Sequence, residues 1–296
     1  MTRIFLTIAI SFLLTGTVTP QKKTDVEAEG LSGSVHTVTT ESSESISIGA
    51  LEESRPNRKL GSLTFNSKGQ LVERVIYDDY GFLVGTERYF RDVADHLIMT
   101  ELYDPKRRRQ EKRVFIYRRN RLEETITHDG RGVAGLRQVN IYDQRGRVKE
   151  EIYYFKTQAI GKTSFDIDGN GNAVNATFFQ SNGSGAVAPI GPCFKAHKVS
   201  YSYDSRGRVT EEIAYGLDGS VKRKSSYHYD DKGNLSEEMR VDSYSTLKFV
   251  HSYDCDAQDN WTKQTIQIHT SREPLFGDRP DESKRMVVKT RQITYY

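Results

Sequence analysis

A short turn motif recurs along this chain and constrains its fold more than any other feature. The motif is an aromatic residue, a polar residue, two variable positions, a glycine, one variable position and an aliphatic residue. It occurs three times between Tyr203 and Met239, and three further copies fit upstream. The six turn glycines are Gly69, Gly81, Gly146, Gly207, Gly219 and Gly233.

Each copy has the chemistry of a strand, a tight turn and a second strand. Broad aromatic side chains pack well on a pleated surface. The Asp or Asn that usually follows accepts backbone hydrogen bonds, and glycine adopts the positive φ that a tight reversal needs. Because turns this short join antiparallel strands, the motif predicts an all-β fold, an antiparallel meander of β-hairpins.

A glutamate recurs near the start of the predicted strands. Glu211 follows Val209 by two residues, and Glu237 follows Leu235 in the same way. In the intervening strand the equivalent position is Arg223. Since side chains alternate between faces with a period of two, we expect Glu211, Arg223 and Glu237 to form a cross-strand charge ladder. The alternative is a solvated face whose charges do not meet.

The start of the chain has the layout of an export signal. A basic Arg3 precedes an apolar run from Ile4 to Leu14, and small residues follow. This pattern predicts a signal peptide over residues 1–20, because the apolar run is too short to span a bilayer. The alternative is an uncleaved anchor. We expect residues 21–30 to be a flexible leader and 31–296 to be a single β domain without a transmembrane anchor.

Several stretches interrupt the repeat. Residues 31–40 alternate like a first strand, and a polar segment follows up to Lys59. Residues 92–102 fit either a short helix or an irregular strand. Two stretches rich in Gly, Ser, Pro or charge predict long loops near 181–197 and 270–285.

Residues 106–121 are the most basic part of the chain, with nine Lys or Arg. They fit either a patch for an acidic polymer or a hairpin whose solvated charges protect a sheet edge. We favour the hairpin, because Glu123 and Glu124 adjoin it. The net charge of +3 is too small to indicate a polyanion partner, and export argues against nucleic acid.

The Tyr-Asp-x-x-Gly turns, together with Gly-Arg-Val at 146–148 and 207–209, resemble the YD repeats of the RHS family. The run Asp259-Asn260-Trp261-Thr262-Lys263 resembles a Gly-Asn-Trp-Thr-Lys turn of small exported proteins of this type, with Asp259 in place of the glycine. The resemblance implies an extended meander that forms a curled or spiral sheet. It does not imply toxin delivery, because no additional C-terminal domain follows the repeats.

Two sets of residues are candidates for structural chemistry. Asp166, Asp168 and Asn170 match the first half of a calcium loop, but Thr177 stands where its bidentate glutamate belongs. The hairpin motif explains the same residues without a metal ion. Cys193 and Cys255 are the only cysteines, and in an oxidising compartment they form either one disulfide or separate thiols.

The sequence contains no recognisable catalytic motif. Histidines lack ligand spacing, and neither a nucleophile elbow nor a phosphate-binding loop is present. We therefore expect a non-catalytic, periplasmic or extracellular scaffold or binding surface, whose partner is an envelope polymer or protein. No cofactor is implied. The alternative is a hydrolase, for example one acting on glycans, that assembles its carboxylates from distant strands.

Overall fold

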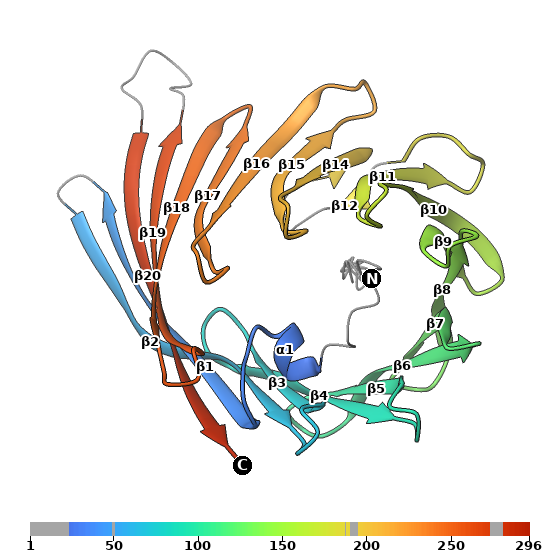
Figure 1. Ribbon diagram of the computed structural model, residues 1–296, viewed down its shortest axis with the longest axis horizontal. Coiled ribbons are helices and arrows are strands. Elements are labelled where there is room, and N and C mark those ends of the chain that lie inside the picture. The colour runs from blue at the N-terminus through green and yellow to red at the C-terminus, as the bar shows by residue number, and fades with distance from the viewer. Residues whose placement is uncertain (1–23, 49–50, 187, 190–194, 273–280) are drawn as a thin grey trace. The chain divides into compact units, whose positions relative to one another are not determined.

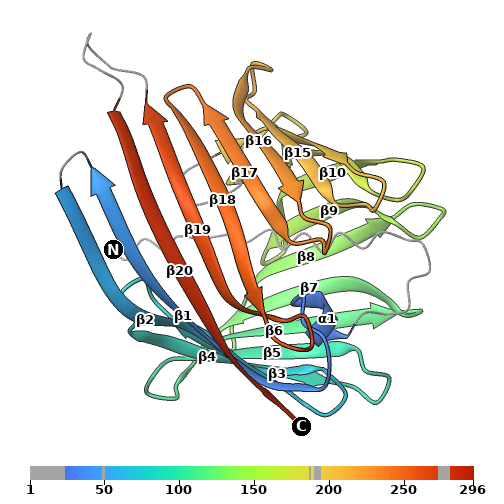
Figure 2. The ribbon, with the colours of Figure 1, turned by 60° about the vertical axis from the view of Figure 1, so that its left-hand side comes forward.

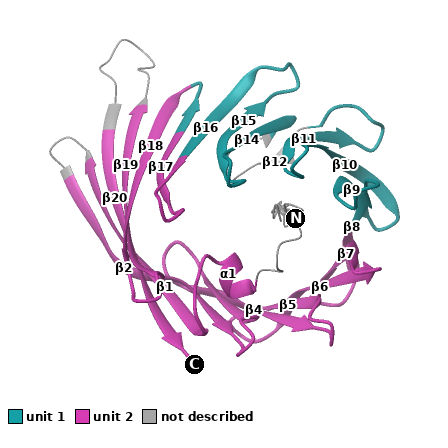
Figure 3. Ribbon diagram, viewed as in Figure 1, with its two compact units in different colours: residues 1–19, 138–227, 240–243 teal, residues 20–137, 228–239, 244–296 magenta. Residues whose placement is uncertain are grey.

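The computed structural model describes residues 24–48, 51–186, 188–189, 195–272 and 281–296. Nearly all of them lie in β-strands, joined by short turns (Figure 1). The chain divides into two compact units, coloured separately in Figure 3. One unit comprises residues 138–227 and 240–243, and the other comprises residues 20–137, 228–239 and 244–296.

The larger unit contains the two ends of the described chain. Its elements are α1 (Asp25–Ala28), β1 (Val35–Ile48), β2 (Leu51–Phe65), β3 (Leu71–Tyr77), β4 (Leu83–Arg91), β5 (Leu97–Tyr103), β6 (Arg109–Arg118), β7 (Arg121–Asp129), most of β17 (Leu235–Asp242), β18 (Ser245–Cys255), β19 (Trp261–Arg272) and β20 (Asp281–Tyr295). Residues 92–102 therefore hold a turn and nearly all of β5, and no helix.

The smaller unit holds the middle of the chain. Its elements are most of β8 (Ala134–Tyr142), β9 (Val148–Phe155), β10 (Gln158–Ile167), β11 (Ala173–Gln180), β12 (Ala188–Pro189), β13 (Lys195–Ala196), β14 (Lys198–Tyr203), β15 (Val209–Tyr215) and most of β16 (Val221–Tyr229). β12 and β13 pair only with each other, within the stretch 181–197 that was expected to be a loop.

The turns follow one hydrogen-bonding scheme. In the β3–β4 turn, the Asp78 carboxylate accepts hydrogen bonds from the backbone N–H groups of Tyr80 and Phe82, each at 2.9 Å. Gly81 has a φ of 84° and donates its N–H to the Asp78 carbonyl. Asp104, Asp129, Asp143, Asp168, Asp204 and Asp256 accept the same pair of bonds in their own turns.

A β-bulge follows the turns of Asp78, Asp104, Asp168, Asp204 and Asp256. Tyr77 pairs with Leu83, but its neighbour Ile76 pairs with Gly85, so that Val84 is an extra residue on β4. The same one-residue shift occurs between β14 and β15 and between β15 and β16. A bulge of one residue exchanges the two faces of the strand beyond it.

The helix α1 packs on one face of the larger unit. Val26, Leu31, Val35, Val38 and Phe65 form a buried cluster there. A capping box at Thr24 and Glu27 begins the helix. The Asp25 carboxylate accepts a hydrogen bond from the backbone N–H of Leu71 at 2.6 Å and forms an ion pair with Arg91 at 2.5 Å. Residues 24–30 are therefore docked, and the expectation of a flexible leader fails for them because these polar side chains have partners on β3 and β4.

The smaller unit has its own buried cluster. Ala176, Phe178, Ala196, Val199 and Ala214 form it, with Phe165 and Tyr201 packed against it. Small alanines on β11 and β15 let neighbouring strands carry large side chains on the same face, as close packing requires.

Pairing of the two chain ends closes the strand order. β1 pairs with β2 on one side and, from Val35 to Ser47, with β20 on the other. All the strands except β12 and β13 belong to one 18-stranded sheet. An open meander would leave its first and last strands as free edges. The fold is instead a closed antiparallel β-barrel, and the expected extended, curled or spiral sheet is wrong, because the pairing of β1 with β20 removes both edges.

Candidate functional site

Small and polar side chains lie along one face of β1. Thr40, Ser42 and Glu44 are two residues apart and share the face that Val38 presents to the core beneath α1. Ser42 and Glu44 are buried, with relative exposures of 3% and 4%. β2 and β20 flank β1 on either side, as Figure 2 shows.

Three guanidinium groups surround the Glu44 carboxylate. Arg55 and Arg58 of β2 lie 3.8 and 3.7 Å from it, and Arg285 of β20 forms a closer ion pair from the other side. A buried carboxylate is costly unless it is paired, and the three arginines supply partners for Glu44. Glu53 is a second carboxylate beside Arg55, so three guanidinium groups face two carboxylates and the cluster keeps an excess of positive charge.

Two further cations continue this face along β20. Lys289 pairs in register with Ser42, and Arg291 pairs with Thr40, so both lie on the same face as Glu44. The Arg291 guanidinium stacks on the Trp261 ring at 3.6 Å, and its Nε and Nη1 atoms are buried without a hydrogen-bond partner. Burial lowers the pKa of Arg291 to about 10, and burial together with the Arg291 charge lowers the pKa of Lys289.

We call Arg55, Arg58, Arg285, Lys289 and Arg291 the cationic strip. Its acidic counterparts on the same face of β1 and β2 are Glu44 and the exposed Glu53, which lies 3.8 Å from Arg55. β19 adds Gln264, Ile266 and Ile268 to this face, because they pair with Lys289, Val287 and Arg285. The strip is therefore a positively charged surface with a neutral border.

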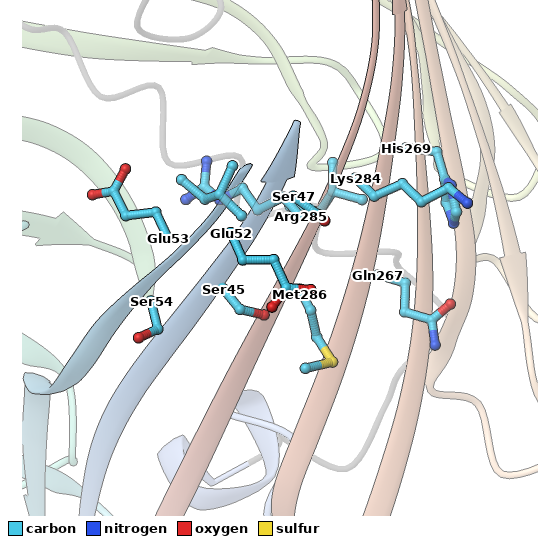
Figure 4. A pocket seen from close by; sticks show the side chains of 12 residues that line it. Ser45, Ser47, Glu52, Glu53, Ser54, Gln267, His269, Lys284, Arg285 and Met286 are labelled. Carbon is cyan, nitrogen blue, oxygen red and sulfur yellow. The ribbon is translucent and has the colours of Figure 1, made fainter. Parts of the chain in front are cut away.

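A groove of about 470 Å³ lies over the ends of the same strands (Figure 4). Ser54, Ser45, Met286 and Gln267 pair in register across β2, β1, β20 and β19 and form one row along it. They lie on the opposite face from Glu44, since their sequence positions alternate with those of the strip. The groove and the cationic strip are nevertheless contiguous, because Arg285 of the strip and its acidic counterpart Glu53 also line the groove.

The six motif glycines occupy equivalent places in their turns. Their φ angles are 71°, 84°, 81°, 76°, 75° and 94° for Gly69, Gly81, Gly146, Gly207, Gly219 and Gly233. Asp259 takes the glycine position in the β18–β19 turn with a φ of 61°. These residues shape turns and do not converge on a site.

The three residues of the expected charge ladder do not share one face. Arg223 lies opposite Ala214 and forms an ion pair with Glu212 at 2.7 Å. Glu211 pairs with Lys224 at 2.6 Å, and Glu237 pairs with Lys248 at 2.8 Å. The ladder fails because the bulge after the Gly219 turn shifts the register of β16 by one residue, which places Arg223 on the other face from Glu211.

The calcium candidate belongs to the turn between β10 and β11. The Asp168 carboxylate accepts the backbone N–H groups of Asn170 and Asn172, and Asp166 accepts the Asn175 amide at 2.9 Å. The carboxylates of Asp166 and Asp168 thus have partners within the hairpin. Among the residues that the structure describes, no group of three His, Cys, Asp or Glu side chains has a metal-binding arrangement.

The predicted disulfide stays a prediction. Cys255 is half-buried at the end of β18. Cys193 lies outside the described residues, as do the expected signal peptide and residues 273–280 of the second expected loop.

The basic stretch 106–121 forms the β5–β6 turn, β6 and the β6–β7 turn. Four of its arginines have acidic partners: Arg108 pairs with Asp104, Arg109 with Glu101, Arg113 with Glu111 and Arg118 with Glu123. Part of the positive charge of this stretch is therefore compensated by acidic residues on the same and neighbouring strands. Within the described part of the chain, no helix is long and apolar enough to span a bilayer.

Comparisons with known proteins identify no family. No family model matches the chain, and no curated protein matches it. The chain is similar to a solved porin-like protein from Bacteroides uniformis, with 11% identity, a TM-score of 0.41, and coverage of 88% of this chain and 96% of that chain. Weaker likenesses, each covering 88% of this chain and 86% of the other, link it to a DUF1329 family protein from Desulfovibrio piger (7% identity, TM-score 0.23) and a LolA superfamily protein from Nitrosomonas europaea (8% identity, TM-score 0.21).

These results correct the expected relationship to the RHS family. No family model supports that assignment, and the closed strand order differs from the open spiral sheet that the resemblance implied. The Tyr-Asp-x-x-Gly turns therefore resemble those of YD-repeat proteins only as local hairpin turns, and the assignment to YD-repeat proteins is wrong.

Proposed function

We propose that this chain is an exported, non-catalytic β-barrel that works surrounded by water, as an envelope or extracellular scaffold with a binding surface. The predicted signal peptide supports export to the periplasm or beyond. The proposal is carried by one observation, the distribution of charge over the two faces of the strands.

Charged residues stand next to each other at the centres of many strands. Such doublets are Glu73-Arg74 in β3, Lys112-Arg113 in β6, Glu150-Glu151 in β9, Glu211-Glu212 in β15 and Glu237-Glu238 in β17. Because neighbouring side chains of a strand point to opposite faces, each doublet places a charge on both faces. A lipid-facing Arg or Lys near the bilayer centre costs about 2–4 kcal/mol in a membrane barrel, and a Glu or Asp costs less but is also unfavourable. This pattern supports a barrel with water on both faces.

The ion pairs follow the same distribution. On β3, Glu73 pairs with Arg88 of β4 at 3.3 Å, while Arg74 pairs with Glu29 beyond α1 at 2.9 Å. On β15, Glu211 and Glu212 pair with Lys224 and Arg223 respectively. Cross-strand pairs of this kind suit a solvated or partly solvated surface on either side.

The carboxylates of the groove do not support hydrolysis. Glu52 and Glu53 are neighbours on β2 and lie on opposite faces, whereas a glycosidase needs two carboxyl groups that face one bond, about 5–9.5 Å apart. The Glu151 carboxyl, whose pKa is raised by burial, accepts a hydrogen bond from the Tyr153 hydroxyl at 2.6 Å. This carboxyl is therefore engaged in a hydrogen bond within β9.

Cell fractionation tests this proposal. We expect the chain, produced with its own N-terminus in a bacterium with two membranes, to be recovered without detergent from the periplasm or medium. Intact mass should show loss of about the first twenty residues, as expected of a signal peptide. A chain that stays in the membrane pellet after carbonate extraction, and that conducts ions in planar bilayers, would instead be a membrane channel and would refute the proposal.

A further inference from the structure

The cationic strip combines a fixed framework with uncompensated charge. Glu44 is buried and holds Arg55, Arg58 and Arg285 around one point, which limits the positions these long side chains adopt. The side chains of Arg55 and Arg285 are 49% and 45% exposed, so an outside ligand can reach them. A framework of this kind binds anions at a lower entropic cost than free surface arginines do.

Lys289 and Arg291 are two residues apart on one face of β20, and neither forms an ion pair with a residue that the structure describes. The charge of Glu29 acts on Arg291 and opposes the lowering of its pKa. The pKa of each is lowered by burial, and the pKa of Lys289 is lowered further by the Arg291 charge. Two partly buried cations side by side destabilise the free protein. A bound anion would remove this cost, so the arrangement favours an occupied state.

Trp261 orients the Arg291 guanidinium. The ring covers one face of the guanidinium plane at 3.6 Å and leaves Nε and Nη1 without a hydrogen-bond partner. A guanidinium edge whose two N–H groups are buried without a partner matches the two oxygens of a phosphate or carboxylate. Stacking against an aromatic ring fixes the direction of that edge.

The length of the strip indicates a ligand with several charges. Arg285 and Arg291 are six residues apart on the same face of β20, a distance of about 20 Å in an extended strand. A single small ion can occupy only one end of this distance. We infer that the cationic strip binds an extended ligand carrying several phosphate groups, which engage the arginines around Glu44 and the Lys289–Arg291 pair together. This inference rests on the proposed binding function and names its ligand class.

Trp261 is the only tryptophan in the sequence, so its fluorescence reports on this site directly. We expect long-chain polyphosphate to change that fluorescence saturably and to bind at least tenfold more tightly than orthophosphate. The double variant Lys289→Gln/Arg291→Gln should weaken polyphosphate binding at least tenfold. Arg291→Lys, which keeps the charge but loses the planar fork, should weaken it severalfold.

Lys284→Gln is the matched control. Lys284 lies on β20 like the strip residues, but on the opposite face, where it pairs in register with His269. Polyphosphate binding should be unchanged in this variant. If Lys284→Gln weakens polyphosphate binding as much as the strip variants do, or if the fluorescence shows no saturable change, the inference is overturned. Neither result would affect the proposed function, which is tested separately by fractionation without detergent.

Two further measurements distinguish the ligand source and exclude misfolding. Vesicles containing phosphatidylglycerol present phosphate on a lipid head group, and binding to them but not to polyphosphate would assign the phosphate recognition to lipid. In the free protein, Lys289→Gln should leave the melting temperature unchanged or raise it, because it relieves repulsion with Arg291. A clear fall would mean that Lys289 is already paired, which would contradict the inference.

Discussion

At the scale of residues, a single side-chain oxygen, usually of a carboxylate, organises most of the turns. In the β14–β15 turn, Asp204 Oδ1 accepts the N–H groups of Arg206 and Arg208, and its other oxygen accepts the Arg208 guanidinium. The backbone N–H of Arg208 is the main reason that the pKa of Asp204 is lowered. Asn66 accepts the equivalent bonds from Lys68 and Gln70, so a neutral side-chain oxygen serves the same turn.

This chemistry predicts the acid sensitivity of the fold. A carboxyl whose pKa is lowered by folding contributes stability above its unfolded pKa, near 3.8, and loses it as the pH falls through the folded value. Asp104 and Asp143 have pKa values lowered in the same way. We expect the urea midpoint to fall as the pH decreases from about 5 towards 2, in the range where such carboxyls titrate.

The matched variants are Asp204→Asn and Asp204→Ala. The first keeps the acceptor that Asn66 shows to be sufficient, and should weaken the dependence on pH while keeping most of the stability at neutral pH. The second removes the acceptor and should lower the urea midpoint at all pH values. Identical midpoints for the two variants would contradict the role of this oxygen in the turn.

Bulges decide which side chains meet at the scale of elements. The aliphatic residue that opens a strand and the glutamate two positions later lie on opposite faces, since the residue between them is the bulge. Leu71 packs in the core beneath α1, whereas Glu73 pairs with Arg88 on the other face. The sequence shows these residues two apart, and a regular strand would place them together.

The register of β16 leads to a second prediction. Arg223 and Glu212 have side chains that are 13% and 20% exposed, so Arg223→Leu leaves a poorly solvated carboxylate and should cost about 1–3 kcal/mol of unfolding free energy. Lys224→Leu, which breaks the more exposed pair with Glu211, should cost less than about 1 kcal/mol.

Rescue variants identify the partner. Glu212→Gln should recover part of the loss caused by Arg223→Leu, because the amide needs no counter-charge. Glu211→Gln should not. Urea unfolding of the four variants measures both effects, and rescue by Glu211→Gln alone would show that the bulge register is different in solution.

At the scale of the whole molecule, one buried side chain reinforces the joining of the two chain ends that the β1–β20 pairing makes. Asn260 is fully buried in the β18–β19 turn. Its amide accepts the Ser32 N–H at 2.6 Å and donates to the Ser32 carbonyl and to the Tyr295 hydroxyl, each at 2.8 Å. Asn260 thus connects a turn of the C-terminal hairpins to the residues just before β1 and to the end of β20.

Asn260→Ala should therefore cost about 2–4 kcal/mol, since it leaves buried backbone groups of Ser32 unpaired. Asn234 is the control, because it holds the same position in the β16–β17 turn and its amide bonds to Asp230 of that turn. Asn234→Ala should cost less than about 1 kcal/mol, as expected for partly exposed polar groups. Equal losses of unfolding free energy for the two variants, in thermal or urea unfolding, would mean that the contacts with Ser32 and Tyr295 add nothing to stability.

The sequence by itself determined the local structure. A turn forms where Asp or Asn is followed by Gly three residues later, because the side-chain oxygen and the positive φ act within five residues. The strand propensities of the flanking residues act over similarly short distances. The antiparallel hairpins and the predominance of strands follow from these local effects. The resemblance built on the same turns misled the assignment of family, since a local motif carries no information on how distant strands pair.

Tertiary structure decided which strands become neighbours and which faces the side chains occupy. β1 and β20 are separated by more than 200 residues in sequence, and their pairing depends on hydrogen bonding between sheet edges rather than on any short motif. The cationic strip exists only through that pairing, because Arg58 and Lys289 meet across Ser42 from opposite ends of the chain. Bulges then select the face, since a shift of one residue exchanges buried and exposed positions along the whole strand.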